Sequence, residues 1–211
     1  MVTERRTFLR WSLSSVAGFA VAGSTRADTS IVAHDDPWLA ELGAKKHKAF
    51  IDVMEFFPDG TPFSRVKTLL RVMRESYGVA ADDIGIAVGM HSRGLAHLLS
   101  ANAWQDLGLA EWLAPQLNGA QAAALTAGAA TVAKTGAESV RELRALGVHV
   151  LACRETIGRW AERVATKKGE SAVDVASRIT SGLHEGIEPV PAMIAAAMVA
   201  QERAAKYIAL A

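Results

Sequence analysis

The chain has 211 residues, of which half are hydrophobic, 6% are aromatic and 21% are charged, and its formal net charge is +1. This length suits one domain with a substantial core, and the balanced charge gives no reason to expect nucleic acid as a partner. The chain contains a single cysteine, which excludes an internal disulfide and any metal or iron–sulfur site built from several cysteines. We expect no metal and no cofactor.

The first 27 residues differ in pattern from the rest. Arg5 and Arg6 precede Thr-Phe-Leu, a modestly apolar stretch follows at 11–23, and small residues lead to Ala27. These are the parts of a secretory signal, and the paired arginines match the type read by the twin-arginine translocase. The apolar stretch is shorter than the roughly 20 residues that span a bilayer. We expect a signal peptide at 1–27, cleaved after Ala27, and a periplasmic protein; an uncleaved anchor and a chance basic N-terminus are the alternatives.

The rest of the chain alternates predicted strands with predicted helices. A polar lead-in segment is expected at 28–46. Short runs rich in β-forming residues then predict five strands, at 49–54, 84–90, 148–152, 187–190 and 207–210. One-sided apolar stripes predict helices at 62–77, after His91, at 140–146, at 156–165, at 172–179 and from Pro191 onward. This order predicts an α/β fold with a mostly parallel sheet of about five strands, covered on both faces.

Residues 102–135 are harder to assign. They contain Trp104 and Trp112 followed by an alanine-rich run. Helical turns are expected at 109–117 and a further helix at 121–132. We interpret this segment as an insertion into the domain, and core packing is the expected role of both tryptophans.

Two of the expected loops lie where α/β proteins carry functional groups. Ligands bind beyond the carboxyl ends of parallel strands, and residues 91–94 and 153–156 follow the second and third predicted strands. Both loops lead into expected helix N-termini, whose free amides favour anions. A thiol in such a place can have its pKa lowered from about 8.5 towards neutrality, which would make Cys153 a nucleophile. Arg154 adds positive charge there, and Glu155 opposes it.

Each candidate residue also has a structural interpretation. A lone cysteine at the end of an apolar strand is often a small buried hydrophobe, and His91 is either an auxiliary acid or base, a ligand-orienting group or a hydrogen-bonded loop residue. The motif His-Ser-Arg-Gly lacks the hydrolase pattern G-x-S-x-G, and the histidines show no metal-ligand spacing. The candidate ligand-binding residues around Cys153 and His91 are Ser92, Arg93, Gly94, Arg154 and Thr156.

Four segments, taken together, carry a resemblance to a known family. They are residues 48–78, Ile84-Gly-Ile-Ala-Val-Gly-Met-His91, Leu146-Gly-Val-His-Val-Leu-Ala-Cys153, and the tail Gly186-Ile-Glu-Pro-Val-Pro-Ala192 that runs through Gln201 to Tyr207-Ile208. A glycine-ended helix followed by a strand and a cysteine, and a late strand followed by a helix with glutamine before a terminal tyrosine, recur in the DsrE/DsrF-like family. The chain resembles that family, in particular its exported, periplasmic members.

The resemblance implies a three-layer α/β/α domain at residues 47–211 that forms homo-oligomers. It also implies that Cys153 receives and passes on sulfur as a persulfide, with a sulfur donor or acceptor protein as partner. The expected function is that of a periplasmic sulfur carrier or sulfur-trafficking factor, sulfurtransferase-like if it is an enzyme. The segment at 102–135 departs from the family, which usually has a shorter link there. The alternative is a non-catalytic ligand-binding or assembly module in which the cysteine is structural.

Overall fold

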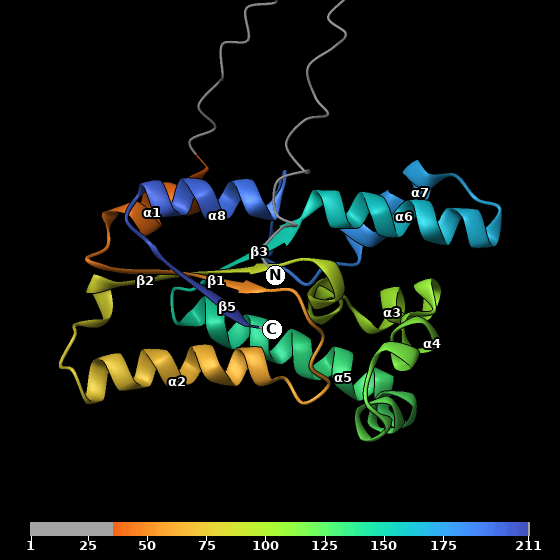
Figure 1. The fold of residues 1–211 in the computed structure, drawn as a ribbon, viewed down its shortest axis with the longest axis horizontal. Helices are drawn as coiled ribbons and strands as arrows, with labels where there is room; N and C mark the ends of the chain where they lie inside the picture. Colours follow the sequence, from red (N-terminus) through yellow and green to blue (C-terminus); the bar gives the residue numbers. More distant parts are fainter. Residues whose placement is uncertain (1–35, 211) are drawn as a thin grey trace, which may run out of the picture. The chain divides into compact units, whose positions relative to one another are not determined.

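The computed structural model describes residues 36–210. The predicted signal peptide and the first part of the lead-in segment lie outside these residues. The sheet consists of five parallel strands in the order β4-β3-β2-β1-β5 (Figure 1). The strands are β1 (His47–Val53), β2 (Ile84–Met90), β3 (His149–Cys153), β4 (Glu188–Val190) and β5 (Lys206–Leu210). The predicted α/β fold with a five-stranded parallel sheet is confirmed.

The helices occupy the connections between strands. The α-helices are α1 (Pro37–Ala44), α2 (Thr61–Glu75), α3 (Ala101–Leu107), α4 (Leu109–Leu113), α5 (Gly119–Ala145), α6 (Arg154–Lys168), α7 (Ala172–Ser181) and α8 (Met193–Glu202). Short 3₁₀ helices are η1 (Ala81–Asp83), η2 (Ser92–Leu98) and η3 (Ala114–Gln116). No helix among these described residues is long and apolar enough to cross a membrane.

The strand order determines which face of the sheet each helix covers. From β1 to β4 the chain moves steadily towards one edge, so right-handed crossovers place α2 and α5 on the same face. From β4 the chain returns to the opposite edge, beside β1, and the same handedness then places α8 on the other face, next to α1 (Figure 1). The result is a three-layer α/β/α arrangement, with α3, α4, α6 and α7 beyond the carboxyl ends of the strands.

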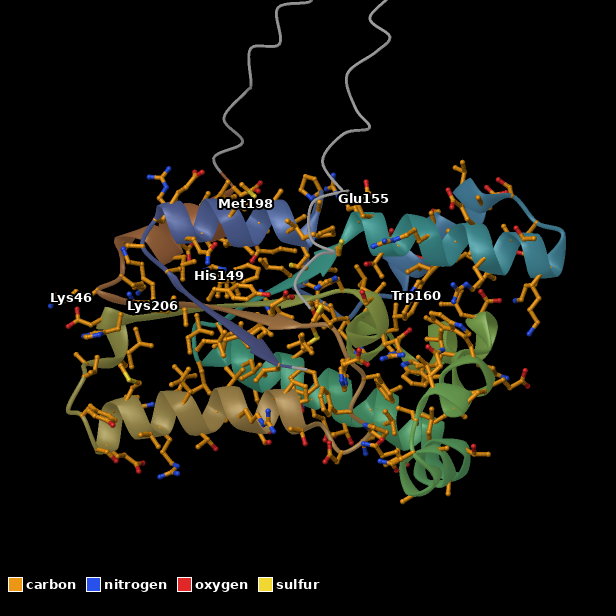
Figure 2. The ribbon with its side chains drawn as sticks, viewed as in Figure 1. Lys46, His149, Glu155, Trp160, Met198 and Lys206 are labelled. Carbon is orange, nitrogen blue, oxygen red and sulfur yellow. The ribbon has the colours of Figure 1, made fainter. Side chains whose placement is uncertain are left out.

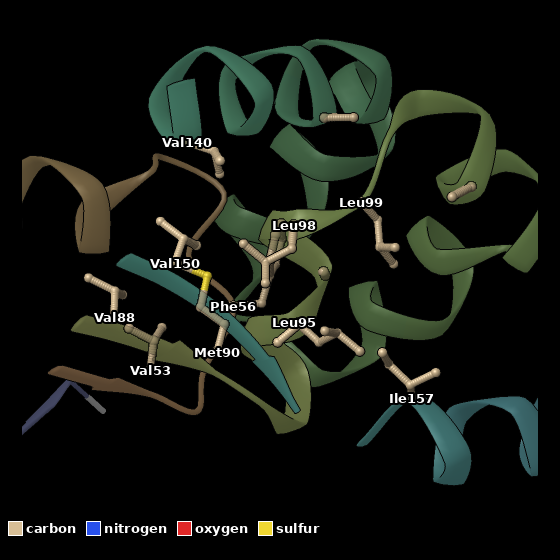
Figure 3. Close-up of a cluster of buried hydrophobic side chains, with 14 of the residues drawn as sticks. Val53, Phe56, Val88, Met90, Leu95, Leu98, Leu99, Val140, Val150 and Ile157 are labelled. Carbon is tan, nitrogen blue, oxygen red and sulfur yellow. The ribbon is translucent and has the colours of Figure 1, made fainter. Parts of the chain in front are cut away.

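Each face of the sheet has its own hydrophobic core, because successive side chains of a strand point to opposite faces. The smaller core lies under α1 and α8 and includes Trp38, Phe50, Leu151, Cys153 and Met193. The larger core lies against α2 and α5 and continues past the carboxyl edge towards α6. Figure 3 shows this second core, with strand residues Val53, Val88, Met90 and Val150 near Leu95, Leu98, Val140 and Ile157.

Two segments contain more helix than the sequence indicated. Part of the expected lead-in forms α1, whose Trp38 and Leu42 are buried in the smaller core. Two separate helices were expected at 121–132 and 140–146, but α5 runs through both, with non-helical backbone angles only at Gly128. The alanine-rich composition favours helix throughout. Gly136 does not end the helix; it lets α5 approach the carbonyl oxygen of His97, which would lie only 2.6 Å from an added Cβ.

The segment after His91 is a 3₁₀ helix, η2, where an amphipathic α-helix was expected. All residues from Gly94 to Leu98 are buried, so the segment has no polar face of the kind that a surface α-helix requires. Gly94 packs against the backbone of Val53, where no Cβ would fit. The loop at 91–94 therefore leads into a 3₁₀ helix and lacks the regular α-helix N-terminus that was expected there.

Candidate functional site

Three residues of interest lie at the carboxyl edge of β1, β2 and β3. Asp52 is the penultimate residue of β1, His91 directly follows β2, and Cys153 ends β3. Met90 pairs with Ala152 across β2 and β3, and the backbone of His91 is still extended. His91 and Cys153 are the next residues after this pair, so they lie side by side on neighbouring strands. Neighbouring strands are about 4.8 Å apart in a sheet.

These side chains leave the sheet on the face that α8 covers. Phe50 and Leu151 belong to the core under α8, and Asp52 and Cys153 stand two positions further along the same strands. Because side chains alternate along a strand with a period of two, each pair shares a face. His91 lies on this face too, since its ring contacts Asp52.

Asp52 is held between a histidine and a tyrosine. The Nε2 of His91 lies 2.9 Å from Oδ1 of Asp52, and the side chains are 13% and 9% exposed. The angles of this ion-pair contact fall outside those of a regular hydrogen bond, and neither atom has another polar partner within residues 36–210. On the other side, the hydroxyl of Tyr207 donates a hydrogen bond of 2.7 Å to Oδ2. We call these three residues the Asp52 cluster.

The contacts within the Asp52 cluster shift the ionisation of its members. Burial by itself would raise the pKa of Asp52, but the contacts with His91 and Tyr207, together with the charge of His91, outweigh burial and hold that pKa below its ordinary value. The hydrogen bond to Asp52 raises the pKa of Tyr207 to about 12, with smaller contributions from burial and from the negative charge of Asp52. At neutral pH, Asp52 is an anion and Tyr207 a neutral donor.

Cys153 lies in an apolar environment. It is 3% exposed and packs in the smaller core with Val190 and Met193. It precedes the first turn of α6, but its side chain forms no capping hydrogen bond. Arg154 and Glu155, whose charges were expected beside the thiol, are both exposed, and Figure 2 shows Glu155 at the start of α6. The surroundings of the sulfur are those of a core residue.

Ser92 and Thr156 join the two loops of this edge. The backbone N–H of Ser92 donates a 3.2 Å hydrogen bond to Oγ1 of Thr156, which is buried. Ser92 has a φ of 50°, a region that residues other than glycine rarely occupy. Its hydroxyl lies 3.4 Å from Nδ1 of His91. The structure thus brings Ser92, Thr156 and His91 together as the sequence analysis expected.

Arg93 is engaged by an acidic residue. Its Nε donates a 2.6 Å hydrogen bond to Oε2 of Glu55, and its Nη1 donates to Oε1 of Gln116 at 3.1 Å. Its charge is therefore balanced by Glu55. Gly94 packs against the backbone of Val53, and the predicted ligand-binding role of Arg93 and Gly94 stays a prediction.

Asp52 and Tyr207 were not among the predicted site residues. The signal for Asp52 was present, because it is the one charged residue in the apolar run Ala-Phe-Ile-Asp-Val-Met at 49–54, and a charge in a buried strand requires a partner. The partner was not recognisable, because Tyr207 is 155 residues away in the sequence.

Comparisons with known proteins add no family assignment. No protein-family model matches the chain, and no curated protein matches it. In the part of the chain that the structure describes, no group of three or more histidine, cysteine, aspartate or glutamate side chains is arranged to hold a metal ion. The fold and site therefore define the chain as an α/β protein whose carboxyl edge places a carboxylate-bound histidine next to the strand that ends in its only cysteine.

Proposed function

We propose that the protein is a DsrE-like sulfur carrier, in which Cys153 accepts sulfur as a persulfide and His91 assists the transfer. The observation that carries this proposal is the contact of 2.9 Å between His91 and Asp52, on the strand next to the one that Cys153 ends. A histidine bound to a carboxylate is a common arrangement for an acid or base that acts on a neighbouring nucleophile. The resemblance of the segments ending in His91 and Cys153 to the DsrE/DsrF-like family supports the same assignment.

The proposed reaction is a thiol–persulfide exchange. The sulfur of Cys153 attacks the outer, sulfane sulfur of a donor persulfide, a new sulfur–sulfur bond forms, and the sulfur–sulfur bond of the donor breaks. The donor leaves as a thiol, and Cys153 becomes a persulfide, so no external oxidant or reductant is consumed. His91 takes the proton of the Cys153 thiol and returns it to the leaving sulfur, with Nδ1 as the proton-accepting atom.

The burial of Cys153 adds a requirement to this proposal. At 3% exposure the thiol is out of reach of a bulky donor, so transfer needs a local opening of the segment between β3 and α6 or of the neighbouring α8. Local openings of this kind occur in native proteins at a free-energy cost below that of global unfolding. Small inorganic polysulfide is for this reason the donor to test first.

Intact-mass measurement tests the proposal directly. The protein is purified without reductant and incubated with inorganic polysulfide, with Cys153→Ser in parallel. We expect an added sulfur on the wild type alone, removed by reductant. His91→Gln should slow the loading about a hundredfold, while His47→Gln, an exposed histidine at the other end of β1, should leave it unchanged. An unmodified wild-type thiol after incubation would contradict the proposal.

A second candidate function is a non-catalytic binding or assembly module. The apolar, 3% exposed environment of Cys153 favours a structural cysteine, and a cavity of about 520 Å³ between α4 and α6 offers a binding surface. This cavity is lined by Trp112 and Trp160, whose rings meet edge to face, and Arg163 lies 5.0 Å above the Trp112 ring. If this is the function, Cys153→Ser should retain full activity in vivo. Alkylation of the wild-type Cys153 should then proceed only as fast as global unfolding.

We further propose export through the twin-arginine pathway to the periplasm, with Arg5 and Arg6 as the recognised pair. The support is the signal pattern of residues 1–27, which lie outside the described structure. The mature protein should begin at Asp28, and replacing both arginines by lysine should retain the precursor in the cytoplasm. Mass spectrometry of periplasmic and cytoplasmic fractions measures both outcomes, and a periplasmic double-lysine variant would argue against this route.

Self-association is the corresponding proposal for the quaternary state. β5 is an edge strand whose Tyr207 and Ile208 are 44% and 37% exposed. On α8, Ile194 and Met198 are 75% and 58% exposed, and Figure 2 shows Met198 on this helix. Open strand edges and clustered apolar side chains favour association. Sedimentation equilibrium should therefore give a mass above that of one chain, and Ile194→Lys should lower it.

A further inference from the structure

We infer that Asp52 is a positioning residue that fixes the orientation and the tautomer of His91, and that Tyr207 holds Asp52 in place for this role. The inference rests on the proposed function, because it assigns to Asp52 and Tyr207 the support of a histidine that acts on Cys153. It goes further in naming two residues that were not among the predicted site residues, one from the interior strand β1 and one from the edge strand β5.

The two oxygens of Asp52 face partners on opposite sides. β1 lies between β2 and β5 in the sheet, and Oδ1 faces His91 after β2 while Oδ2 accepts from Tyr207 on β5. A carboxylate that is 7% exposed would be strongly disfavoured without such partners. With one partner on each side, the carboxylate cannot rotate without breaking a contact, so its Oδ1 stays beside the imidazole.

The position of this carboxylate bears on which ring nitrogen of His91 carries the proton. An ionised carboxylate only accepts hydrogen bonds, and the contacts with His91 and Tyr207 keep Asp52 ionised at neutral pH. Nε2 is the ring nitrogen that lies 2.9 Å from Oδ1, so the negative charge of Asp52 favours a hydrogen on Nε2, and the lone pair of the neutral ring is then left on Nδ1. A carboxylate that holds a histidine in one tautomer is a recurring device wherever that histidine acts as a base or ligand. The Ser92 hydroxyl lies 3.4 Å from Nδ1 and can donate a hydrogen bond to that lone pair.

A purely structural role explains the cluster less well. β1 and β5 are already joined by backbone pairing from Ala49 to Val53, so the Tyr207 hydroxyl is not needed to place the edge strand. Replacing a buried ion pair by apolar side chains of similar size is often neutral or stabilising. Packing alone does not require a charged residue at position 52, and positioning His91 accounts for its presence.

The first test measures the histidine itself by NMR of the full chain labelled with ¹⁵N-histidine. The Nε2–H proton of His91, assigned by its loss in His91→Gln, should appear at the downfield position of a carboxylate-bound imidazole. It should disappear in Asp52→Asn and persist in Asp106→Asn, an exposed aspartate of α3. Absence of the signal from the wild type, or its persistence in Asp52→Asn, would overturn the inference. Should Asp52→Asn fail to fold, Tyr207→Phe must still move the same resonance.

The second test measures sulfur loading of Cys153 from inorganic polysulfide in the same variants. Asp52→Asn should load about tenfold more slowly than wild type and Tyr207→Phe two- to threefold more slowly, as expected for loss of a supporting contact behind a functional histidine, with Asp106→Asn unchanged. Equal rates in Asp52→Asn and wild type would refute the positioning role. If the wild type does not load at all, the proposed function fails, and the NMR result still decides whether Asp52 sets the tautomer.

Discussion

Two histidines on the same connection after β2 have opposite surroundings. His91 lies at the sheet edge against the carboxylate of Asp52. His97, six residues on, is 4% exposed and packs against the rings of Phe56 and Phe63, and its Nε2 accepts a 3.1 Å hydrogen bond from the backbone N–H of Phe57. Burial lowers the pKa of His97 to about 3, only partly offset by the charge of Asp59. His97 is a neutral core residue, whereas His91 has an anion beside it. The residue type alone therefore does not predict the role of either histidine. The two differ because His91 contacts a carboxylate, whereas His97 packs against aromatic rings.

Lowering the pH should give the largest change in the free energy of unfolding, because the folded protein keeps His97 neutral while the unfolded chain binds a proton there. Its pKa is about 3 in the folded protein and about 6.5 in the unfolded chain, so its contribution to stability is complete above pH 6.5 and is lost as the pH falls towards 3. The free energy of unfolding should fall by up to about 1.4 kcal/mol per pH unit below pH 6. Urea unfolding between pH 4.5 and 7 measures this slope. His97→Gln should flatten it, leaving only the smaller part due to His184, whose pKa burial also lowers; an unchanged slope would remove His97 from the explanation.

Asp52→Asn should destabilise the protein by about 1–3 kcal/mol at pH 7, because it replaces a paired buried anion. The pKa of Asp52 is lowered in the folded state, so the stability it contributes is present above its ordinary pKa and disappears as the pH falls through the lowered value. The difference between variant and wild type should therefore shrink below pH 4. Parallel urea titrations at pH 7 and pH 3 measure it, and a difference that does not depend on pH would contradict an ionised Asp52.

Cys153→Ser should cost about 1–2 kcal/mol, because the variant puts a hydroxyl into the apolar core under α8. Cys153→Ala removes the sulfur without adding a polar group and should cost less. Thermal unfolding of both variants ranks them. A serine variant as stable as wild type would mean that the side chain at 153 reaches water, and would make the thiol more accessible than its burial indicates.

Tyr207→Phe should give the smallest change, about 1 kcal/mol or less at pH 7, since the tyrosine is half-exposed and its hydrogen bond is partly screened by solvent. Its pKa is raised to about 12 from an ordinary value of 10.0 by the hydrogen bond to Asp52. The stability it contributes is therefore complete below pH 10 and is lost as the pH rises towards 12. The difference in stability between Tyr207→Phe and the wild type should therefore shrink between pH 10 and pH 12, which alkaline unfolding followed by circular dichroism measures.

The sheet was predictable because its signals are local. Each strand is a short apolar run bounded by turn residues, and the observed bounds lie within two residues of the predicted ones. The environment of Cys153 was not predictable, since α1 and α8 build the core around it from the two ends of the described chain. The loops at His91 and Cys153 were correctly placed at one edge, but the anionic partner of His91 comes from inside a strand that reads as apolar. Long-range side-chain contacts, such as that of Tyr207 with Asp52, leave no periodic pattern in a sequence.

The position of β5 beside β1 has a consequence for the order of events during synthesis. A ribosome makes Asp52 long before Tyr207, which follows it by 155 residues, so a nascent chain cannot complete the Asp52 cluster until almost all of the described domain has been translated. Until then Oδ2 of Asp52 lacks its Tyr207 partner and must stay hydrated, and the side of β1 that pairs with β5 stays open to water. A chain stopped before residue 206 would leave this gap permanently. On the proposed twin-arginine route, a translocase that accepts only folded cargo would then have a physical basis for rejecting it.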